Sequence, residues 1–357
     1  MEKTKKILVI NLGSTSTKVA VFEADKMLAS ESVSHSADEV KGFGTIFDQY
    51  ELRRNAILGA LEKNNISLDD LVAIASRGGN TKPIPGGIYA ICTAMIDDGK
   101  SGKYGQHPNI IGEIVAYDLG KEKGIPALTI DPPTTDEMCV YARYSGIPQI
   151  QRQSSFHALN QKATARKIAA RLGKAYDEAN LIVAHLGGGI SVGAHRKGKV
   201  IDVNNALDGD GPFSPERAGS LPTGDLVKMC FSGRYSERDI LKLIQGGGGL
   251  AAYLGTTSGL EIEKRIAAGD EVAAEVFEAM SYQIAKEIGA CAAVLEGRVD
   301  AIALTGSLAY SKTLTSSLIS KISFVAEVFI DPGENEMEAL AAGVVRYLEG
   351  NEQLAAY

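Results

Sequence analysis

Three glycine-containing turns, each directly after an apolar segment, have the residue types needed to bind phosphate. The first is LGSTSTK (12–18), whose hydroxyls and backbone N–H groups could surround phosphate oxygens while Lys18 adds a positive charge. The second is HLGGGISVG (185–193), where three adjacent glycines indicate close approach of a ligand, since one glycine suffices for a turn. The third is TGSLAYS (305–311), which could contact the phosphates or sugar of a nucleotide. The first and third could also be ordinary connecting turns.

Charged and imidazole side chains stand where predicted strands end. Arg77 could hold an anion, and Asp131 could bind Mg²⁺, although a surface arginine and a turn-capping aspartate are the plain alternatives. His185 replaces a hydrophobic residue beside the three glycines, whereas a lone histidine such as His157 is by default a core residue. Ligands of open α/β sheets bind outside the carboxyl ends of the strands, so a shared crevice is expected. The residues predicted to line it are Asn11, Arg77, Asp131, His185 and Gly306.

The apolar pattern predicts the α/β elements that would position these side chains. Strands are expected at 7–11, 71–76, 126–131, 181–185 and 300–306, and helices at 49–63, 161–172, 270–295 and 335–348. The strand and turn that begin the chain recur about half a chain length later, when Asn11 is aligned with His185. This repeat suggests a duplicated domain. We place the domains at 1–150 and 151–335, allowing for a C-terminal helix (about 336–357) that packs back on the first.

Composition limits the classes of function. The chain has 357 residues, 45% hydrophobic and 23% charged, with a net charge of −7, which is typical of a globular protein of about two domains. No basic cluster favours nucleic acid, and no apolar run is long enough for a membrane span. The scattered cysteines show no zinc spacing and indicate reduced thiols in the cytoplasm. The segment that comes near a Walker A loop, GAHRKGKV (193–200), fails at its last position. No dinucleotide-binding GxGxxG turn follows a predicted strand.

Taken together, the motifs resemble the butyrate kinases of the acetate kinase (acetokinase) group, within the sugar kinase/Hsp70/actin superfamily. The segments that carry the resemblance are NLGSTSTK (11–18), DPP (131–133), SSFHALNQ (154–161), 185–219 and LGTTSGLE (254–261). The resemblance covers nearly the whole chain. It implies an α/β fold of two related actin-like (ribonuclease H-like) domains around a nucleotide cleft. It also implies reversible phosphoryl transfer between ATP and a short-chain carboxylate, giving ADP and an acyl phosphate, with Mg²⁺ and a homo-oligomer of at least two chains.

The resemblance assigns roles residue by residue. The catalytic set that it implies is Arg77, Asp131, His157, His185 and Arg217. The nucleotide-binding set is Asn11, Ser14, Thr15, Ser16, Lys18, Gly187, Gly188, Gly189, Gly306 and Ser307. The metal-linked set is Asn11, Asp131 and Glu336.

Two positions depart from the acetate kinase pattern. The second active-site arginine of that pattern aligns with Gly224, and Arg217 is expected to serve instead. The aspartate that contacts adenosine aligns near Gly259. Alternatives to a butyrate kinase are an acetate or propionate kinase, an actin/Hsp70-like ATPase switch without an acyl substrate, and a non-enzymatic sugar sensor. The lack of a recognisable peptide-binding domain or DNA-binding helices counts against the last two.

Overall fold

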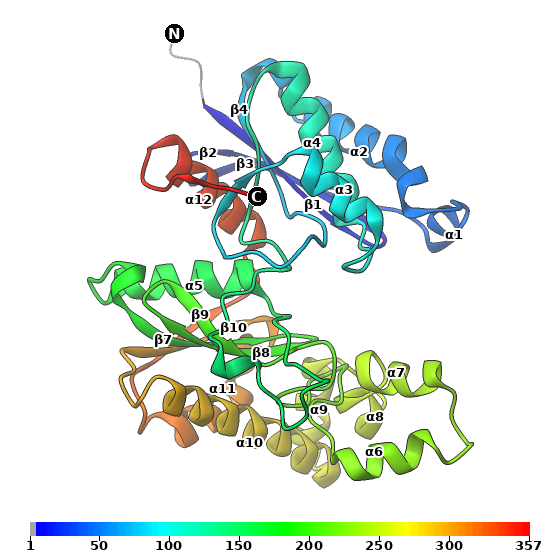
Figure 1. The fold of residues 1–357 in the computed structure, drawn as a ribbon, viewed down its shortest axis with the longest axis vertical. Coiled ribbons are helices and arrows are strands. Elements are labelled where there is room, and N and C mark those ends of the chain that lie inside the picture. The colour runs from blue at the N-terminus through cyan, green and yellow to red at the C-terminus, as the bar shows by residue number, and fades with distance from the viewer. Residues whose placement is uncertain (1–4) are drawn as a thin grey trace. The chain divides into compact units, whose positions relative to one another are not determined.

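The computed structural model describes residues 5–357 and divides them into two compact units (Figure 1). Unit 1 comprises residues up to Thr135 together with Asn335–Tyr357, and unit 2 comprises Asp136–Glu334. The first change of unit therefore falls fifteen residues before the position near 150 expected from sequence. The C-terminal segment belongs to the first unit.

Unit 1 is built on a seven-stranded sheet in the order β12-β5-β6-β4-β1-β2-β3. β1 pairs antiparallel with β2 and parallel with β4, and β4 is parallel to β6. The bounds are β1 (Lys6–Gly13), β2 (Ser16–Glu23), β3 (Lys26–Ser34), β4 (Leu71–Ser76), β5 (Ile88–Ala90), β6 (Ala127–Ile130) and β12 (Leu354–Ala355). The predicted strands at 7–11, 71–76 and 126–131 are thus present, with ends that differ by at most two residues.

Helices cover both faces of this sheet because its central strands are apolar on both sides. Leu8 and Ile10 of β1 pack in one core with helices α2 (Tyr50–Lys63) and α4 (Asn109–Lys123). On the opposite face lies α12 (Glu336–Leu348), where Gly343 fits tightly against Ile130. The remaining helical segments are α1 (Ala37–Lys41), η1 (Ile46–Gln49), η2 (Leu68–Asp70) and α3 (Thr93–Ser101).

Unit 2 contains a five-stranded sheet in the order β11-β10-β7-β8-β9. Its strands are β7 (Asn180–Leu186), β8 (Ile190–Arg196), β9 (Lys199–Val203), β10 (Ala301–Gly306) and β11 (Val328–Pro332). Its principal helices are α5 (Ala158–Arg171), α10 (Glu271–Val294) and α11 (Lys312–Ile322). A smaller group comprises α6 (Thr223–Cys230), α7 (Glu237–Gln245), α8 (Gly249–Leu254) and α9 (Gly259–Ala267). The 3-10 segments are η3 (Tyr141–Arg143), η4 (Tyr176–Glu178) and η5 (Ser307–Tyr310).

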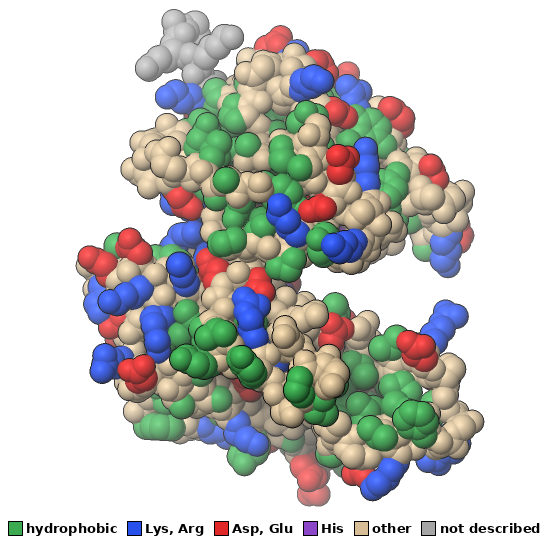
Figure 2. Space-filling model, in the orientation of Figure 1, with side chains coloured by type: hydrophobic (Ala, Val, Ile, Leu, Met, Phe, Trp, Pro, Cys, Tyr) green, Lys and Arg blue, Asp and Glu red, His purple; other side chains and the backbone are tan. Residues whose placement is uncertain are grey.

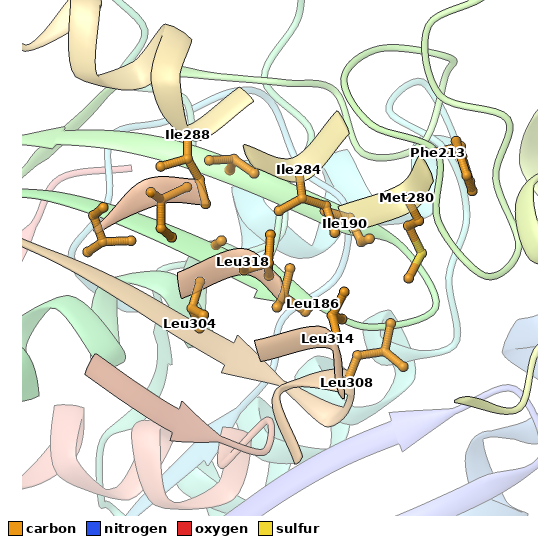
Figure 3. Close-up of a cluster of buried hydrophobic side chains, with 14 of the residues drawn as sticks. Leu186, Ile190, Phe213, Met280, Ile284, Ile288, Leu304, Leu308, Leu314 and Leu318 are labelled. Carbon is orange, nitrogen blue, oxygen red and sulfur yellow. The ribbon is translucent and has the colours of Figure 1, made fainter. Parts of the chain in front are cut away.

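The main core of unit 2 lies between its sheet and the helices α10 and α11 (Figure 3). Met280, Ile284 and Ile288 project from α10 at spacings of four residues toward Leu186 and Leu304 of the sheet. Val272, in the first turn of the same helix, is exposed, so the buried stripe begins further along the helix.

The two sheets repeat one topology. The order β3-β2-β1-β4-β6 in unit 1 corresponds to β9-β8-β7-β10-β11 in unit 2. In both, two antiparallel pairings are followed by two parallel ones. The duplication inferred from the recurring strand and turn is therefore confirmed.

The face of the molecule drawn in Figure 2 shows no large region of one charge. Lysine and arginine side chains are interspersed with aspartate and glutamate over the face seen in Figure 2. Within residues 5–357, no helix combines the length and apolar character that crossing a bilayer demands.

Candidate active site

The register of unit 1 brings three of the predicted residues to one edge of the sheet. Ile10 of β1 is paired with Ser76 of β4, and Ser76 is paired with Thr129 of β6. These three strands are parallel, so the residues that follow them lie at the same edge. Asn11 and Arg77 come next along their strands, and Asp131 directly follows β6.

A carboxylate from the other end of the chain joins this edge. Glu336, the first residue of α12, accepts a hydrogen bond from Asn11 Nδ2 at 2.7 Å and another from Arg77 Nε at 3.1 Å. Asn11 and Arg77 are on the sheet face opposite α4 and therefore face α12. Nη1 of Arg77 is buried, and within residues 5–357 it has no hydrogen-bond partner. A buried guanidinium with an unmatched donor is suited to bind an anion.

Asp131 is fully buried and has a left-handed backbone, with φ of 41°. Its N–H donates to the carbonyl oxygen of Gly87. A non-glycine residue in this conformation is uncommon and marks a backbone held by its surroundings.

The donor types at this edge fit a hard cation. Asn11, Asp131 and Glu336 offer amide and carboxylate oxygens, which Mg²⁺ prefers. Among the described residues, no three His, Cys, Asp or Glu side chains converge closely enough to hold a metal by themselves. Mg²⁺ commonly takes only one or two carboxylates and completes its shell with water and phosphate. The donors therefore suit a metal that arrives with a nucleotide.

The tip of the β1–β2 hairpin carries the predicted phosphate loop. Ser14 and Thr15 are exposed. Lys18 is paired directly with Asn11, so both side chains project from the same face of the sheet. Beneath the tip, the fully buried Arg53 donates to the carbonyl oxygens of Ser14 at 2.9 Å and Ser16 at 2.7 Å. Arg53 thus holds the loop from inside, a role that the helical pattern of 49–63 does not reveal.

Helix α4 holds the chain at the end of β1 and the loop after β4 through two buried polar side chains that lie one helical turn apart. Oδ1 of Asn109 accepts from the N–H of Leu12, and Oε2 of Glu113 accepts from the N–H of Gly79, both at 2.8 Å. Burial raises the pKa of Glu113 to about 7, with the bond from Gly79 opposing the shift. Polar residues at buried positions of an apolar helix were the available signal, and the sequence analysis missed them.

His107 is a further residue that the sequence analysis missed. Its pKa is lowered, first by desolvation and then by the positive charge of Arg77, while Glu336 opposes the shift. His107 is exposed, so its imidazole lies on the solvent side of this sheet edge. It is close enough to Arg77 and Glu336 to interact with both electrostatically.

In unit 2, two of the predicted histidines stack on each other. His185 is buried at the end of β7, in register with Thr305 of β10. His157 immediately precedes α5, and its ring lies parallel to that of His185, with centroids 3.7 Å apart and an interplanar angle of 9°. His157 is half-buried and contacts a second imidazole, whereas the plain interpretation made it a lone core histidine.

The three glycines after β7 are explained by close contacts within the chain. A Cβ on Gly187 would lie 2.9 Å from His185 Nε2, and a Cβ on Gly189 would lie 2.2 Å from Arg217 Nη1. At Gly188 the carboxylate of Glu216 lies at an ordinary contact distance of 3.4 Å. At Gly187 and Gly189 the close approach is made by an imidazole and a guanidinium of the same unit, whereas the predicted approach of a ligand stays a prediction.

Arg217 belongs to the loop that covers this turn. Its Nη1 donates to the carbonyl oxygen of Ala206, whereas its Nε is buried and has no hydrogen-bond partner among the described residues. Burial lowers the pKa of Arg217, and the nearby carboxylates of Glu216 and Asp208 partly offset this. Like Arg77, this side chain retains an unmatched buried donor. Gly224, the position aligned with the family arginine, lies exposed in α6.

Gly306 and Ser307 lie beside the same strand ends. Gly306 has φ of 88°, and a Cβ there would come within 2.4 Å of the Leu186 carbonyl oxygen. Ser307 is exposed at the start of η5. Gly259 is the position near which the adenosine-contacting aspartate of the acetate kinase pattern aligns. A Cβ on Gly259 would lie 2.8 Å from Leu308 Cδ2. The missing aspartate therefore coincides with tight packing of α9 on η5.

An apolar cavity of about 740 Å³ lies elsewhere in unit 2, among α6, α7, α8 and α10. Phe213, Met229, Ile240 and Tyr253 are among its lining residues. None of the predicted site residues lines it, so the cavity is separate from the strand ends that carry them.

A family model and curated relatives place this chain in the same family. Residues 138–349 match the Acetokinase family. The chain is 49% identical over 352 residues to Butyrate kinase 2 of Clostridium acetobutylicum, covering 99% of each protein. It is also 49% identical over 351 residues to a probable butyrate kinase of Listeria monocytogenes, covering 98% of this chain and 99% of that protein.

Solved structures show the same fold at lower identity. The acetate kinase of Porphyromonas gingivalis superimposes with a TM-score of 0.78 at 20% identity, over 95% of this chain and 99% of that one. A propionate kinase of Francisella tularensis gives 0.72 at 21% identity, over 95% and 98%. The mixed α/β fold with two sheets is thus that of acetate kinases of the actin-like type.

Proposed function

The chain belongs to the acetokinase family, and we propose that it transfers the γ-phosphoryl group of ATP reversibly to the carboxylate of butyrate, giving ADP and butanoyl phosphate. The 49% identity to Butyrate kinase 2 across 99% of both chains supports this choice within the family. On the structural side, the observation that carries it is the cluster of Asn11, Arg77 and Glu336, in which one buried donor of Arg77 has no partner among the described residues.

The reaction needs charge neutralisation more than acid–base chemistry. A carboxylic acid is ionised at neutral pH, so the nucleophile requires no general base. It must nevertheless approach an anionic phosphate, and two unit charges 4 Å apart repel by about 4 kcal/mol at an effective dielectric constant of 20. Arg77 binds the carboxylate in this proposal, and Arg217, His157 and His185 donate to the phosphoryl oxygens as charge develops on them.

The hydroxyl-rich loop and the two glycine turns would bind the nucleotide. Ser14, Thr15, Ser16 and Lys18 would contact its phosphates from the β1–β2 hairpin. The turns at 187–189 and 306–307 would contact its phosphates and adenosine. Asn11, Asp131 and Glu336 would hold Mg²⁺, which would neutralise part of the negative charge of the phosphates.

In this proposal, the site residues of unit 1 and those of unit 2 must act on one phosphoryl group. We therefore propose that the units close on the ternary complex during turnover, which also keeps water from the γ-phosphate. Size-exclusion chromatography with light scattering would test the further proposal of a homo-oligomer. Fractionation of the native cells would test the cytoplasmic location.

Preference among acids is expected to be modest. Each buried CH₂ contributes about 0.8 kcal/mol, so butyrate exceeds acetate by about 1.6 kcal/mol, a factor of about fifteen in kcat/KM. Propionate and branched acids of similar size should therefore also react.

The decisive assay measures ADP release and trapped acyl hydroxamate across C2 to C5 acids, with and without Mg²⁺. Butyrate should give the highest kcat/KM and form butyryl hydroxamate. A maximum at acetate or propionate would replace the proposed substrate. Slow ATP hydrolysis that no acid accelerates, without hydroxamate, would instead identify an ATPase switch.

A further inference from the structure

The stacked histidines of unit 2 are held by different sets of buried polar side chains. Three consecutive residues of α5, Asn160, Gln161 and Lys162, are all buried. Lys162 forms an ion pair with Glu137, whereas the two amides lead to the histidines. Since adjacent helical residues point in different directions, each of the three contacts a different part of the unit.

The orientation of the Asn160 amide is determined by its neighbours. Nδ2 lies 2.7 Å from the carbonyl oxygen of Glu334 and 3.3 Å from that of Gly333, and both can only accept. Oδ1 is therefore the atom 2.7 Å from His185 Nδ1, and it must accept from that nitrogen. His185 consequently carries a proton on Nδ1.

The partner of His157 is a hydroxyl, which can donate as well as accept, and it favours the opposite tautomer. Nε2 of Gln161 donates to the carbonyl oxygen of Ser191 at 3.0 Å and to Ser191 Oγ at 2.8 Å. The Ser191 hydroxyl accepts from Gln161, and it lies 2.9 Å from His157 Nδ1, to which it can donate its own proton. Nδ1 of neutral His157 is then an acceptor, and its proton resides on Nε2.

The rest of this network is consistent with that assignment. With Nε2 of Gln161 donating, its Oε1 must accept from Nε2 of His195, 3.0 Å away. In the neutral ring, His195 Nδ1 then carries no proton and accepts from the hydroxyl of Tyr176 at 2.8 Å. Each proton along the chain from Tyr176 to His157 thus has an acceptor.

We propose that Asn160 is a positioning residue that fixes neutral His185 as the Nδ1–H tautomer, while Ser191 and Gln161 fix the stacked His157 as the Nε2–H tautomer. His157 is then a hydrogen-bond donor at Nε2 as a neutral ring. His185 presents a lone pair at Nε2 and becomes a donor there only after it gains a proton. The kinetic consequence, unlike the tautomers themselves, rests on the proposed function.

The two rings differ in what an added proton disrupts. Protonation of His185 at Nε2 leaves its bond to Asn160 intact, because Nδ1–H donates in both forms. Protonation of His157 at Nδ1 would displace the proton that Ser191 donates. Two imidazolium rings 3.7 Å apart would also repel, so only one carries a charge at a time. When anionic substrates draw a proton from solvent to the pair, His185 is the ring that takes it.

Nitrogen NMR on the full chain tests the tautomers without any substrate. The five histidines are labelled with ¹⁵N in their rings and assigned by single His→Gln variants at a pH where the rings are neutral. His185 should show a protonated Nδ1 and an unprotonated Nε2, and His157 the reverse. Asn160→Ala should change the signals of His185 only, and Ser191→Ala those of His157. The control Tyr176→Phe should change His195 alone. Identical tautomers in the two rings, or an unchanged His185 in Asn160→Ala, would overturn the proposal.

Kinetics separate tautomer control from mere structural support. Asn160→Ala should lower kcat about 10- to 100-fold, since the buried partners that orient a reacting imidazole have effects of this size. Asn160→Asp keeps the acceptor for His185 but loses the donors to Gly333 and Glu334. It should retain the Nδ1–H signal and recover most of kcat. If Asn160→Asp keeps that signal yet is as impaired as Asn160→Ala, the role is only to hold residues 333–334, and the proposal fails.

The two levels of failure are distinguishable. A wild-type chain that forms no acyl phosphate but shows opposite tautomers refutes the proposed function alone. An active enzyme whose two rings share one tautomer refutes this inference alone.

Discussion

Replacing the buried carboxyl of Glu113 by an amide should stabilise the protein at high pH and have little effect at low pH. Glu113 is fully buried, and burial raises its pKa from 4.5 to about 7. Between these values the native state binds a proton that the unfolded state has released. Stability therefore falls as pH rises through this window and levels off above pH 7.

The size of the effect follows from the shift. Two to three pKa units at 1.36 kcal/mol each amount to about 3 kcal/mol. Glu113→Gln has nearly the same shape, can still accept from Gly79, and cannot ionise. The variant should match the wild type near pH 5 and exceed its free energy of unfolding by about 3 kcal/mol at pH 8.

Urea unfolding followed by circular dichroism between pH 5 and 8 measures this difference, and the pH dependence of all other groups cancels between the two proteins. The control is Glu122→Gln on the same helix, where the carboxylate is 51% exposed and lies 3.7 Å from Arg54. Its difference from wild type at pH 8 should be much smaller than that of Glu113→Gln, because a half-exposed carboxylate keeps much of its hydration on folding. Parallel curves for wild type and Glu113→Gln would refute the argument that this carboxyl is protonated by burial.

Three other changes have definite expectations. Arg77→Ala should lose about 10³-fold in kcat while unfolding normally, whereas Arg54→Ala should keep activity; near-normal turnover without Arg77 would contradict its role. Gly306→Ala should cost about 2 to 4 kcal/mol of unfolding free energy, because the added Cβ would clash with the Leu186 carbonyl oxygen. Gly297→Ala is the control: its φ is 73°, but no atom lies within 4 Å of the added Cβ, so it should cost only about 1 kcal/mol. Arg53→Met should raise the KM for ATP and cost about 2 to 4 kcal/mol, since the backbone carbonyls of Ser14 and Ser16 lose a charged donor; an unchanged KM would show that the loop holds itself.

The positions of several site residues followed from local patterns. Apolar segments that end in Asn11, Arg77 and Asp131 were recognisable as parallel strands, and the carboxyl ends of such strands meet at one edge. The recurrence of a strand and glycine turn about half a chain length apart was enough to predict a duplicated fold. These features depend on residues close together in sequence, because the spacing of apolar residues and the choice of turn residues follow from the local backbone conformation.

Only the tertiary structure decided which side chains hold these residues in place. Glu336 meets Arg77 across 259 positions, and nothing local in either segment specifies that contact. Arg53, Glu113 and Asn160 lie on helices whose apolar pattern predicts burial but gives no partner for a buried polar group. That partner is a backbone or side-chain atom that arrives from another element. Its identity therefore exists only once the sheets and helices have packed, because a buried polar group must find its hydrogen bonds there.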